Sequence, residues 1–143
     1  LELRLKNVGS KDAYVIRLPE MYLIAAEASM ELGDGTEAYN YLLELANARA
    51  IGGDGATMMS NYGVNSGADI DIDFILNERA RELATENLRF IDLKRTGTLL
   101  TRVAEHNTDA APNIQSHHQL RFIPQEQLDA VLNPDEFYQN PGY

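Results

Sequence analysis

The sequence predicts a mainly α-helical domain that contains a tetratricopeptide-like antiparallel hairpin, long loops and little strand. Two segments, 19–32 and 37–50, consist largely of helix-forming residues with apolar positions at helical spacing. Because only residues 33–36 separate them, the two helices are expected to pack side by side in opposite directions. A third segment, 70–105, keeps a regular apolar spacing through a run of charged residues, which predicts further helix.

Local signals set the boundaries of the hairpin. Pro19 suits the first turn of a helix, where its missing N–H group costs nothing, and Glu20 suits the positive end of the helix dipole. The first helix is expected to stop at Gly33, and Thr36 is predicted to cap the second, which ends before Gly52. A single hairpin cannot bury its own faces, so later helices or another part of the protein must cover it.

The remaining segments are less regular. Residues 1–18 alternate between apolar and polar side chains, which predicts one or two short strands. Residues 52–68 are rich in Gly, Asn and Ser and are expected to form a long loop, while Pro124 is expected to open a short helix. Because the chain starts at Leu1 without a signal-like segment, we expect residues 1–143 to be one domain of a longer protein.

Composition and charge exclude several classes of function. Twelve basic and 22 acidic residues give a net charge of −10. The electrostatic field of this charge repels polyanions, which argues against binding of nucleic acid, and it favours neutral sugars over acidic ones. The absence of cysteine excludes a disulfide framework, a thiolate metal site and a cysteine nucleophile. Apolar residues make up 44% of the chain, enough for a globular core, without the apolar run of about 20 residues that a membrane helix needs.

The third helical segment combines an apolar stripe with a row of charges. The stripe consists of Ile72, Leu76, Ala80, Leu83 and Phe90. The neighbouring row, spaced alternately by three and four, consists of Ile75, Arg79, Glu82, Glu86, Arg89 and Leu93. From opposite charges three or four residues apart we predict a structural ion-pair ladder of Arg79, Glu82, Glu86, Arg89, Asp92 and Arg95. This projection assumes one continuous helix, in which Asn87 is the candidate break.

Three interpretations of this row compete. A structural ladder is favoured, because a planar guanidinium can bridge two carboxylates and so relieve the repulsion between Glu82 and Glu86. A ligand-binding surface is the second interpretation. Catalysis by the same two carboxylates is the least favoured, because flanking arginines lower their pKa values, the wrong direction for a general acid. We therefore predict that the chain has no catalytic residue and is not an enzyme.

Three stretches carry a resemblance to a known family. The run FILNERARELATENLRFIDLKRTG (74–97) resembles the signature of the SusD/RagB family of glycan-binding outer-membrane lipoproteins. Before it, YVIRLPEMYLIAAEASMELGD (14–34) is similar to the family's helix of the kind R-L-x-E-x-Y-L-x-x-A-E-A. After it, APNIQSHHQLRFIPQEQLDAV and QNPGY are similar to the closing segment. The departures are mild, with Asn77 and Asn87 in place of Asp and Gly, and Phe122 where proline is common.

The resemblance implies a function that composition and spacing do not. Members of this family are mostly helical, and their tetratricopeptide-like hairpins pack against a TonB-dependent outer-membrane transporter of the SusC type. They hold oligosaccharides or other nutrients at the cell surface, anchored by a lipidated N-terminal cysteine that this sequence lacks. Their ligand site is usually built from the chain that precedes the stretch matched here. The resemblance thus implies the C-terminal domain of such a protein, with no cofactor.

An acidic run offers a candidate metal site. Asp69, Asp71 and Asp73 imitate the start of a calcium loop, but Phe74 and Ala80 occupy the positions that require Gly and Glu. Capping of the following helix is therefore the preferred interpretation.

Two further candidates lie in loops. His117 and His118 are adjacent and lack the spacing of a zinc site. Tyr62, with Asn61 and Asn65, offers an aromatic platform and amides to a sugar, although no residue is assigned as a ligand contact. The alternative function, which rests on the hairpin alone, is a tetratricopeptide-like scaffold that binds proteins and no small molecule.

Overall fold

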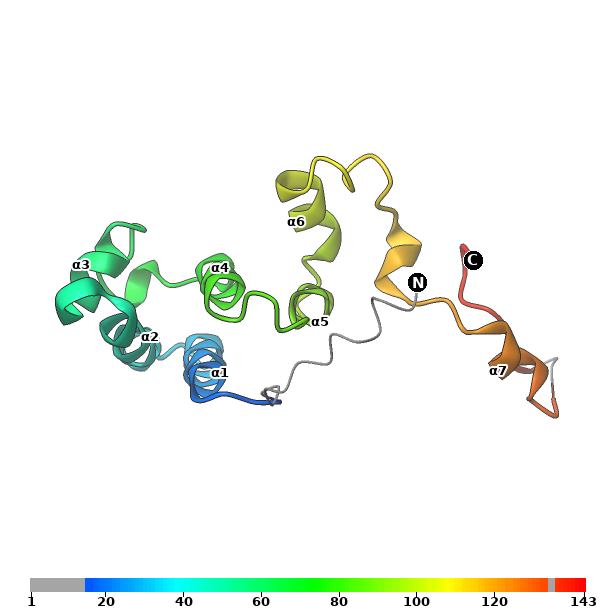
Figure 1. Cartoon of the computed structure of the whole chain (residues 1–143), viewed down its shortest axis with the longest axis horizontal. Coiled ribbons are helices and arrows are strands. Elements are labelled where there is room, and N and C mark those ends of the chain that lie inside the picture. The colour runs from blue at the N-terminus through cyan, green and yellow to red at the C-terminus, as the bar shows by residue number, and fades with distance from the viewer. Residues whose placement is uncertain (1–14, 134–135) are drawn as a thin grey trace, which may run out of the picture. The chain divides into compact units, whose positions relative to one another are not determined.

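The structure is a computed structural model and describes residues 15–133 and 136–143. It forms two compact units, Leu1–Ala84 (unit 1) and Thr85–Tyr143 (unit 2), which are described separately. The α-helices are α1 (Leu18–Glu31), α2 (Gly35–Arg49), α3 (Gly55–Ser60), α4 (Ile72–Glu82), α5 (Arg89–Arg95), α6 (Leu99–His106) and α7 (Gln125–Asp129) (Figure 1). No strand occurs among the described residues, so the prediction of a mainly α protein is confirmed. Strands were predicted within residues 1–18. Residues 1–14 lie outside the described residues, and for residues 15–18 the prediction is wrong, because they contain no strand and α1 begins at Leu18.

The hairpin of unit 1 consists of α1 and α2. Pro19 lies in the first turn of α1 as predicted, and Gly33 follows the helix with a φ of 81°, a conformation that glycine adopts without strain. The prediction that Thr36 caps the second helix is wrong. Asp34 is the cap, because its Oδ1 accepts a hydrogen bond from the Glu37 N–H at 3.0 Å and the helix starts before Thr36.

The helix α4 covers the hairpin and completes the core of unit 1. Its Ile75 and Leu76 are fully buried, as are Leu23 of α1 and Ala38 of α2. Contacts of α4 with α1 add to the extensive packing between α1 and α2. The apolar surface that these three helices bury supplies most of the stabilisation of the unit. A later helix of the same chain therefore provides the partner that the hairpin requires.

The predicted loop 52–68 is more ordered than its composition suggested. It contains α3, and the 3₁₀-helices Ile51–Gly53 and Gly67–Asp69 begin and end the region. The side chain of Asp54 caps α3 by accepting a hydrogen bond from the Thr57 N–H at 2.9 Å. Met59 and Val64 are buried, so apolar packing holds this glycine-rich segment.

The single helix assumed for 70–105 is wrong. The chain forms α4, α5 and α6. Between α4 and α5, Thr85 and Asn87 have φ values of 72° and 61° and cannot continue a right-handed helix, and between α5 and α6 Gly97 has a φ of 70°. Asn87 does mark a break, as considered from the sequence. The buried face of α4 therefore differs in part from the predicted apolar stripe. Leu76 is buried as predicted, but Ala80 is exposed. Ile75, which was assigned to the charged row, is fully buried.

Unit 2 ends in an extended segment fixed by side chains. As predicted, Pro124 directly precedes a short helix, α7. Gln139 accepts from the Ile123 N–H and donates to its carbonyl, both at 2.8 Å. The Tyr143 hydroxyl donates to the Leu120 carbonyl at 2.9 Å.

In the described parts of the chain, no helix has the length and apolar character needed to cross a membrane.

Candidate functional site

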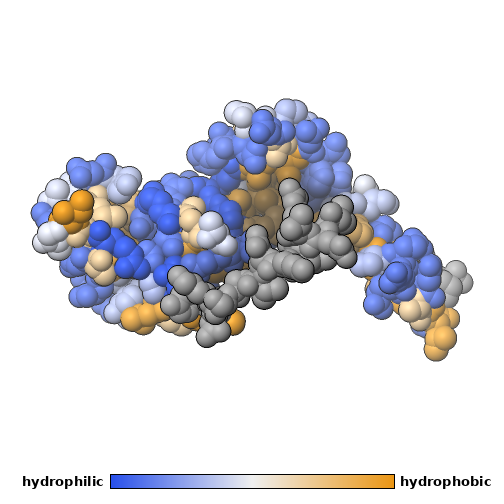
Figure 2. All heavy atoms as spheres, in the orientation of Figure 1, coloured by the Kyte–Doolittle hydropathy of each residue, from blue (hydrophilic) through white to orange (hydrophobic). Residues whose placement is uncertain are grey.

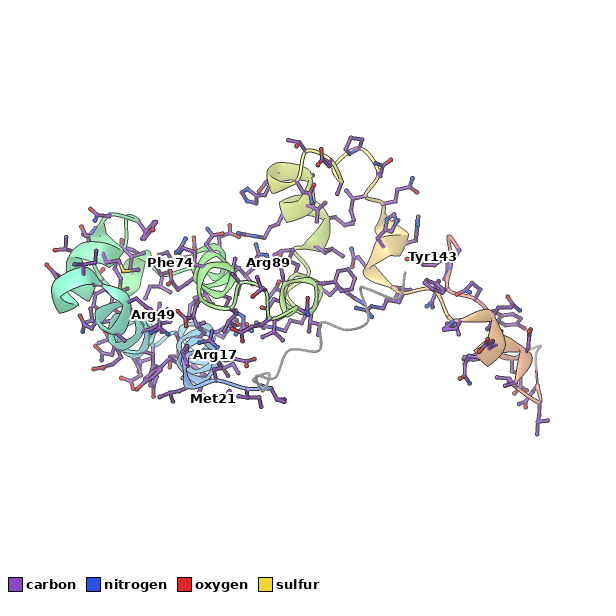
Figure 3. The ribbon with its side chains drawn as sticks, viewed as in Figure 1. Arg17, Met21, Arg49, Phe74, Arg89 and Tyr143 are labelled. Atoms are coloured by element: carbon purple, nitrogen blue, oxygen red, sulfur yellow. The ribbon has the colours of Figure 1, made fainter. Side chains whose placement is uncertain are left out.

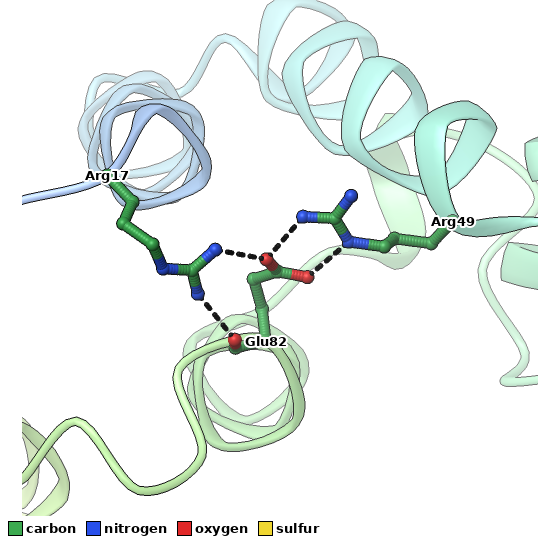
Figure 4. Close-up of polar contacts among 3 residues, drawn as sticks. All are labelled: Arg17, Arg49 and Glu82. Carbon is green, nitrogen blue, oxygen red and sulfur yellow. Dashed lines mark hydrogen bonds and ion pairs between the residues drawn. The ribbon is translucent and has the colours of Figure 1, made fainter. Parts of the chain in front are cut away.

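The most concentrated polar site in unit 1 surrounds Glu82, the last residue of α4 (Figure 4). Arg17, which directly precedes α1, donates from Nη1 to Glu82 Oε1 at 3.1 Å and from Nη2 to the Glu82 carbonyl at 2.8 Å. Arg49, at the end of α2, donates from Nε to Oε2 at 2.8 Å and from Nη2 to Oε1 at 2.6 Å. We call these three residues the Glu82 cluster. It links all three long helices of the unit.

Burial and charge define what the Glu82 cluster can do. The Glu82 side chain is 8% exposed, against 21% for Arg17 and 44% for Arg49. The hydrogen bonds from Arg49 lower the pKa of Glu82, those from Arg17 lower it further, and burial opposes both. The same pairing raises the pKa of Arg49. Glu82 is therefore charged at neutral pH and is unsuited to act as a general acid.

The predicted ladder does not form along one helix. Glu82 bonds Arg17 and Arg49, while Arg79 pairs with Glu20, with 3.9 Å between Nη2 and Oε1. Arg79 is only 4% exposed, which is consistent with a role in packing α4 against α1. Helical spacing could not predict Arg17, Glu20 and Arg49 as partners, because they lie in or directly before other helices.

The other predicted ladder residues belong to unit 2. Glu86 lies in the break before α5, and Arg89 is the first residue of that helix. Burial lowers the pKa of Arg89, the positive charge of Arg102 adds to this effect, and Asp92 opposes it. Arg95 donates from Nε to Asp92 Oδ1 at 3.1 Å, three residues apart on α5. A structural role for the six residues of the predicted ladder stays a prediction. Two of them, Arg79 and Glu82, lie in unit 1, and the other four lie in unit 2.

A groove of about 650 Å³ lies beside the Glu82 cluster. Its lining residues are Ile16, Arg17, Leu18, Pro19, Tyr22, Glu44, Leu45, Ala48 and Arg49. Leu18, Met21 and Ile24 continue from it as an exposed apolar face of α1, spaced by three residues. Figure 3 shows Arg17 directly before α1, Met21 on α1 and Arg49 on α2, and Figure 2 shows hydrophobic residues on the surface where α1 lies. An apolar face of this kind is typical of a contact with another protein surface.

The loop residues considered as a sugar platform are engaged with their neighbours. The guanidinium of Arg81 lies over the Tyr62 ring, with 4.3 Å from Cζ to the ring centroid. Asn65 accepts a hydrogen bond from Ser60 Oγ at 2.9 Å. One face of Tyr62 is therefore covered, which leaves less of the ring for a sugar to stack on.

The acidic run serves helix capping, as the sequence suggested. Asp71 caps α4 by accepting from the Phe74 N–H at 2.7 Å, and Asp69 forms a capping box with Ser66. His118 accepts at Nδ1 from the Gln115 N–H. Within residues 15–133 and 136–143, no three His, Cys, Asp or Glu side chains are grouped to hold a metal ion.

Fold and site together define a mainly helical protein built on a tetratricopeptide-like hairpin, in which ion pairs to the largely buried Glu82 connect three helices. The model of the SusD family matches residues 4–143, so the chain belongs to that family, as the sequence motifs indicated. The chain is 32% identical over 91 residues to "SusD-like protein P38" of Formosa agariphila. This match covers 63% of the chain and 18% of that protein, so it spans less than a fifth of the relative's length. No solved structure matches the chain.

Proposed function

We propose that the chain is the C-terminal helical domain of a longer protein that binds glycans or other nutrients at the cell surface. That protein is a lipid-anchored component of the outer membrane and works with a TonB-dependent transporter in oligosaccharide uptake. The observation that carries the proposal is the family match over residues 4–143, nearly the whole chain. The role is binding without catalysis, which is consistent with a Glu82 that two arginines keep charged.

The exposed apolar face of α1 supports a protein partner for this domain. Leu18, Met21 and Ile24 form a continuous stripe on α1 and are exposed to solvent. A stripe of this kind favours contact with a partner protein, and in the proposed role that partner is the transporter. The same face favours the second candidate, a tetratricopeptide-like scaffold with no small-molecule ligand. The two candidates differ in whether the whole protein binds a glycan and where in the cell it acts.

Glycan binding separates these candidates when the chain is compared with the longer protein. We expect the 143-residue chain alone to bind neutral oligosaccharides with a dissociation constant of about 1 mM or weaker. The chain has no Trp, and Arg81 covers one face of Tyr62. Isothermal calorimetry with neutral starch, mannan and xylan oligosaccharides measures this affinity.

The longer protein is expected to bind at least one of the neutral oligosaccharides in the same assay in the micromolar range. If the longer protein binds none of these oligosaccharides, and no oligosaccharide extracted from the host's growth medium, the result favours the scaffold function. Micromolar binding by the chain alone, lost in Tyr62→Ala and retained in the matched variant Tyr138→Ala, would instead place the principal site in this domain. Tyr138 is exposed and belongs to unit 2, whereas Tyr62 belongs to unit 1.

A further inference from the structure

Unit 2 contains an open groove whose lining differs in charge from the rest of the chain. Its volume is about 470 Å³, and it is lined by Phe90, Ile91, Lys94, Arg95 and Arg121. Four of these residues come from α5, and Arg121 comes from the extended segment before α7. Three of the five are basic, although the chain as a whole carries a net charge of −10. We call this feature the basic groove.

The cations of the basic groove gather around one aromatic ring. Lys94 Nζ lies 5.5 Å and Arg121 Cζ lies 5.0 Å from the centroid of Phe90. Arg95 is paired with Asp92, whereas neither Lys94 nor Arg121 forms an ion pair with any carboxylate among the described residues. The groove therefore holds two positive charges that no acidic side chain of the described structure neutralises.

The backbone that carries Arg121 is held in place from both sides. Its carbonyl accepts a hydrogen bond from Asn140 Nδ2 at 2.5 Å. The neighbouring Leu120 and Ile123 are bonded by Tyr143 and Gln139 of the C-terminal segment. Such bonds fix the Arg121 backbone before a ligand arrives, so binding orders little more than the side chain.

We infer that the basic groove binds the anionic group of an acidic saccharide, either a uronate carboxylate or a sulfate ester. This inference rests on the proposed function and names a class of glycan for it. Lys94 and Arg121 supply donors for the acidic group. Ile91, which is 55% exposed, supplies an apolar surface for the C–H face of the sugar ring, while Phe90 lies under the two cations and holds them at the groove.

The overall charge of −10 does not prevent such binding. Screening at physiological salt confines the effect of a charge to about 8 Å, so a single acidic group is governed by the cations that surround it. A long polyanion, in contrast, meets the acidic remainder of the chain. The inference therefore differs at this groove from the expectation based on net charge alone, that acidic sugars are disfavoured.

The inference is tested by calorimetry on the 143-residue chain, starting at physiological salt, where the net charge of −10 is screened. The probes are tetragalacturonate, a sulfated galactan tetrasaccharide and the neutral galactotetraose. We expect at least one acidic probe to bind about tenfold or more tighter than the neutral one, and this preference to shrink as NaCl is raised. The acidic probe that binds more tightly shows whether the groove recognises the carboxylate or the sulfate.

Matched variants assign the binding to the groove. Lys94→Gln and Arg121→Gln are each expected to weaken the acidic probe about fivefold to tenfold, and Arg121→Lys to retain part of the affinity. The control is Arg81→Gln, which removes the same charge from unit 1, where Arg81 pairs with Glu78. It is expected to stay within about twofold of wild type. Circular dichroism checks that every variant remains folded.

Two kinds of result would overturn the inference. One is equal affinity for acidic and neutral probes, or no acidic binding at all. The other is acidic binding that Lys94→Gln and Arg121→Gln leave unchanged. Either result leaves the proposed function intact, because that function is tested with neutral glycans on the longer protein.

Discussion

Replacing Leu23 by Ala is expected to lower the free energy of unfolding of the chain by about 3 kcal/mol. Leu23 lies in α1 and is 0% exposed, within the core that also contains Ile75 and Leu76 of α4. Truncation removes apolar contacts and leaves a cavity, and a close-packed core relaxes only in part to fill it. Urea denaturation followed by circular dichroism measures the change.

Leu32→Ala is the matched control for this variant, because Leu32 follows α1 directly and is 86% exposed. It is expected to change the free energy of unfolding by less than about 0.5 kcal/mol. Equal stability of the Leu23 and Leu32 variants would mean that α1 is not packed between its neighbours as described.

Glu82→Gln is expected to cost about 2 kcal/mol at neutral pH, between the costs of breaking an exposed and a buried ion pair, because Glu82 is 8% exposed but its partners are 21% and 44% exposed. The neutral amide keeps the shape of the side chain but leaves Arg17 and Arg49 without their carboxylate. Arg49→Gln should cost only about 1 kcal/mol or less, because that side chain is 44% exposed. Thermal or urea unfolding compares the variants with the control Glu105→Gln, whose carboxylate is exposed.

The same cluster predicts how stability depends on pH. The pKa of Glu82 lies below its usual value of 4.5 in the folded chain, so its contribution is complete above about pH 4.5. The contribution is lost as pH falls through the lowered pKa, because protonation removes the charge that both arginines require. The stability difference between wild type and Glu82→Gln should therefore be constant near neutral pH and shrink in acid. A difference as large at pH 2 as at pH 7 would show that the cluster does not act through the charge of Glu82.

The hairpin could be predicted because its signals are local. Pro19, Gly33 and the apolar spacing of α1 and α2 lie within the elements that they define. The break after α4 was harder to place, because Thr85 adopts a positive φ that its residue type disfavours. Only the surrounding fold can impose such a conformation, and sequence periodicity does not record it.

The ion pairs were predicted less well than the helices. Helical spacing finds partners three or four residues apart, as for Asp92 and Arg95. Glu82 is bonded by residues 65 and 33 positions away, and such pairs become visible only when the helices are packed. Arg17 and Arg49 offered no signal beyond their positions at the ends of helices. The basic groove was missed for the same reason, because Arg121 joins α5 from a distant segment.

Purification of the whole protein from the outer-membrane fraction of its host tests the proposed role most directly. We expect the wild type to co-purify with a TonB-dependent transporter in about equal amounts. Met21→Glu should recover markedly less transporter, because the charge interrupts the exposed apolar face of α1, whereas Leu32→Glu should behave as wild type. Recovery of the wild type from the soluble fraction alone, or from the membrane without any such transporter, would contradict the role.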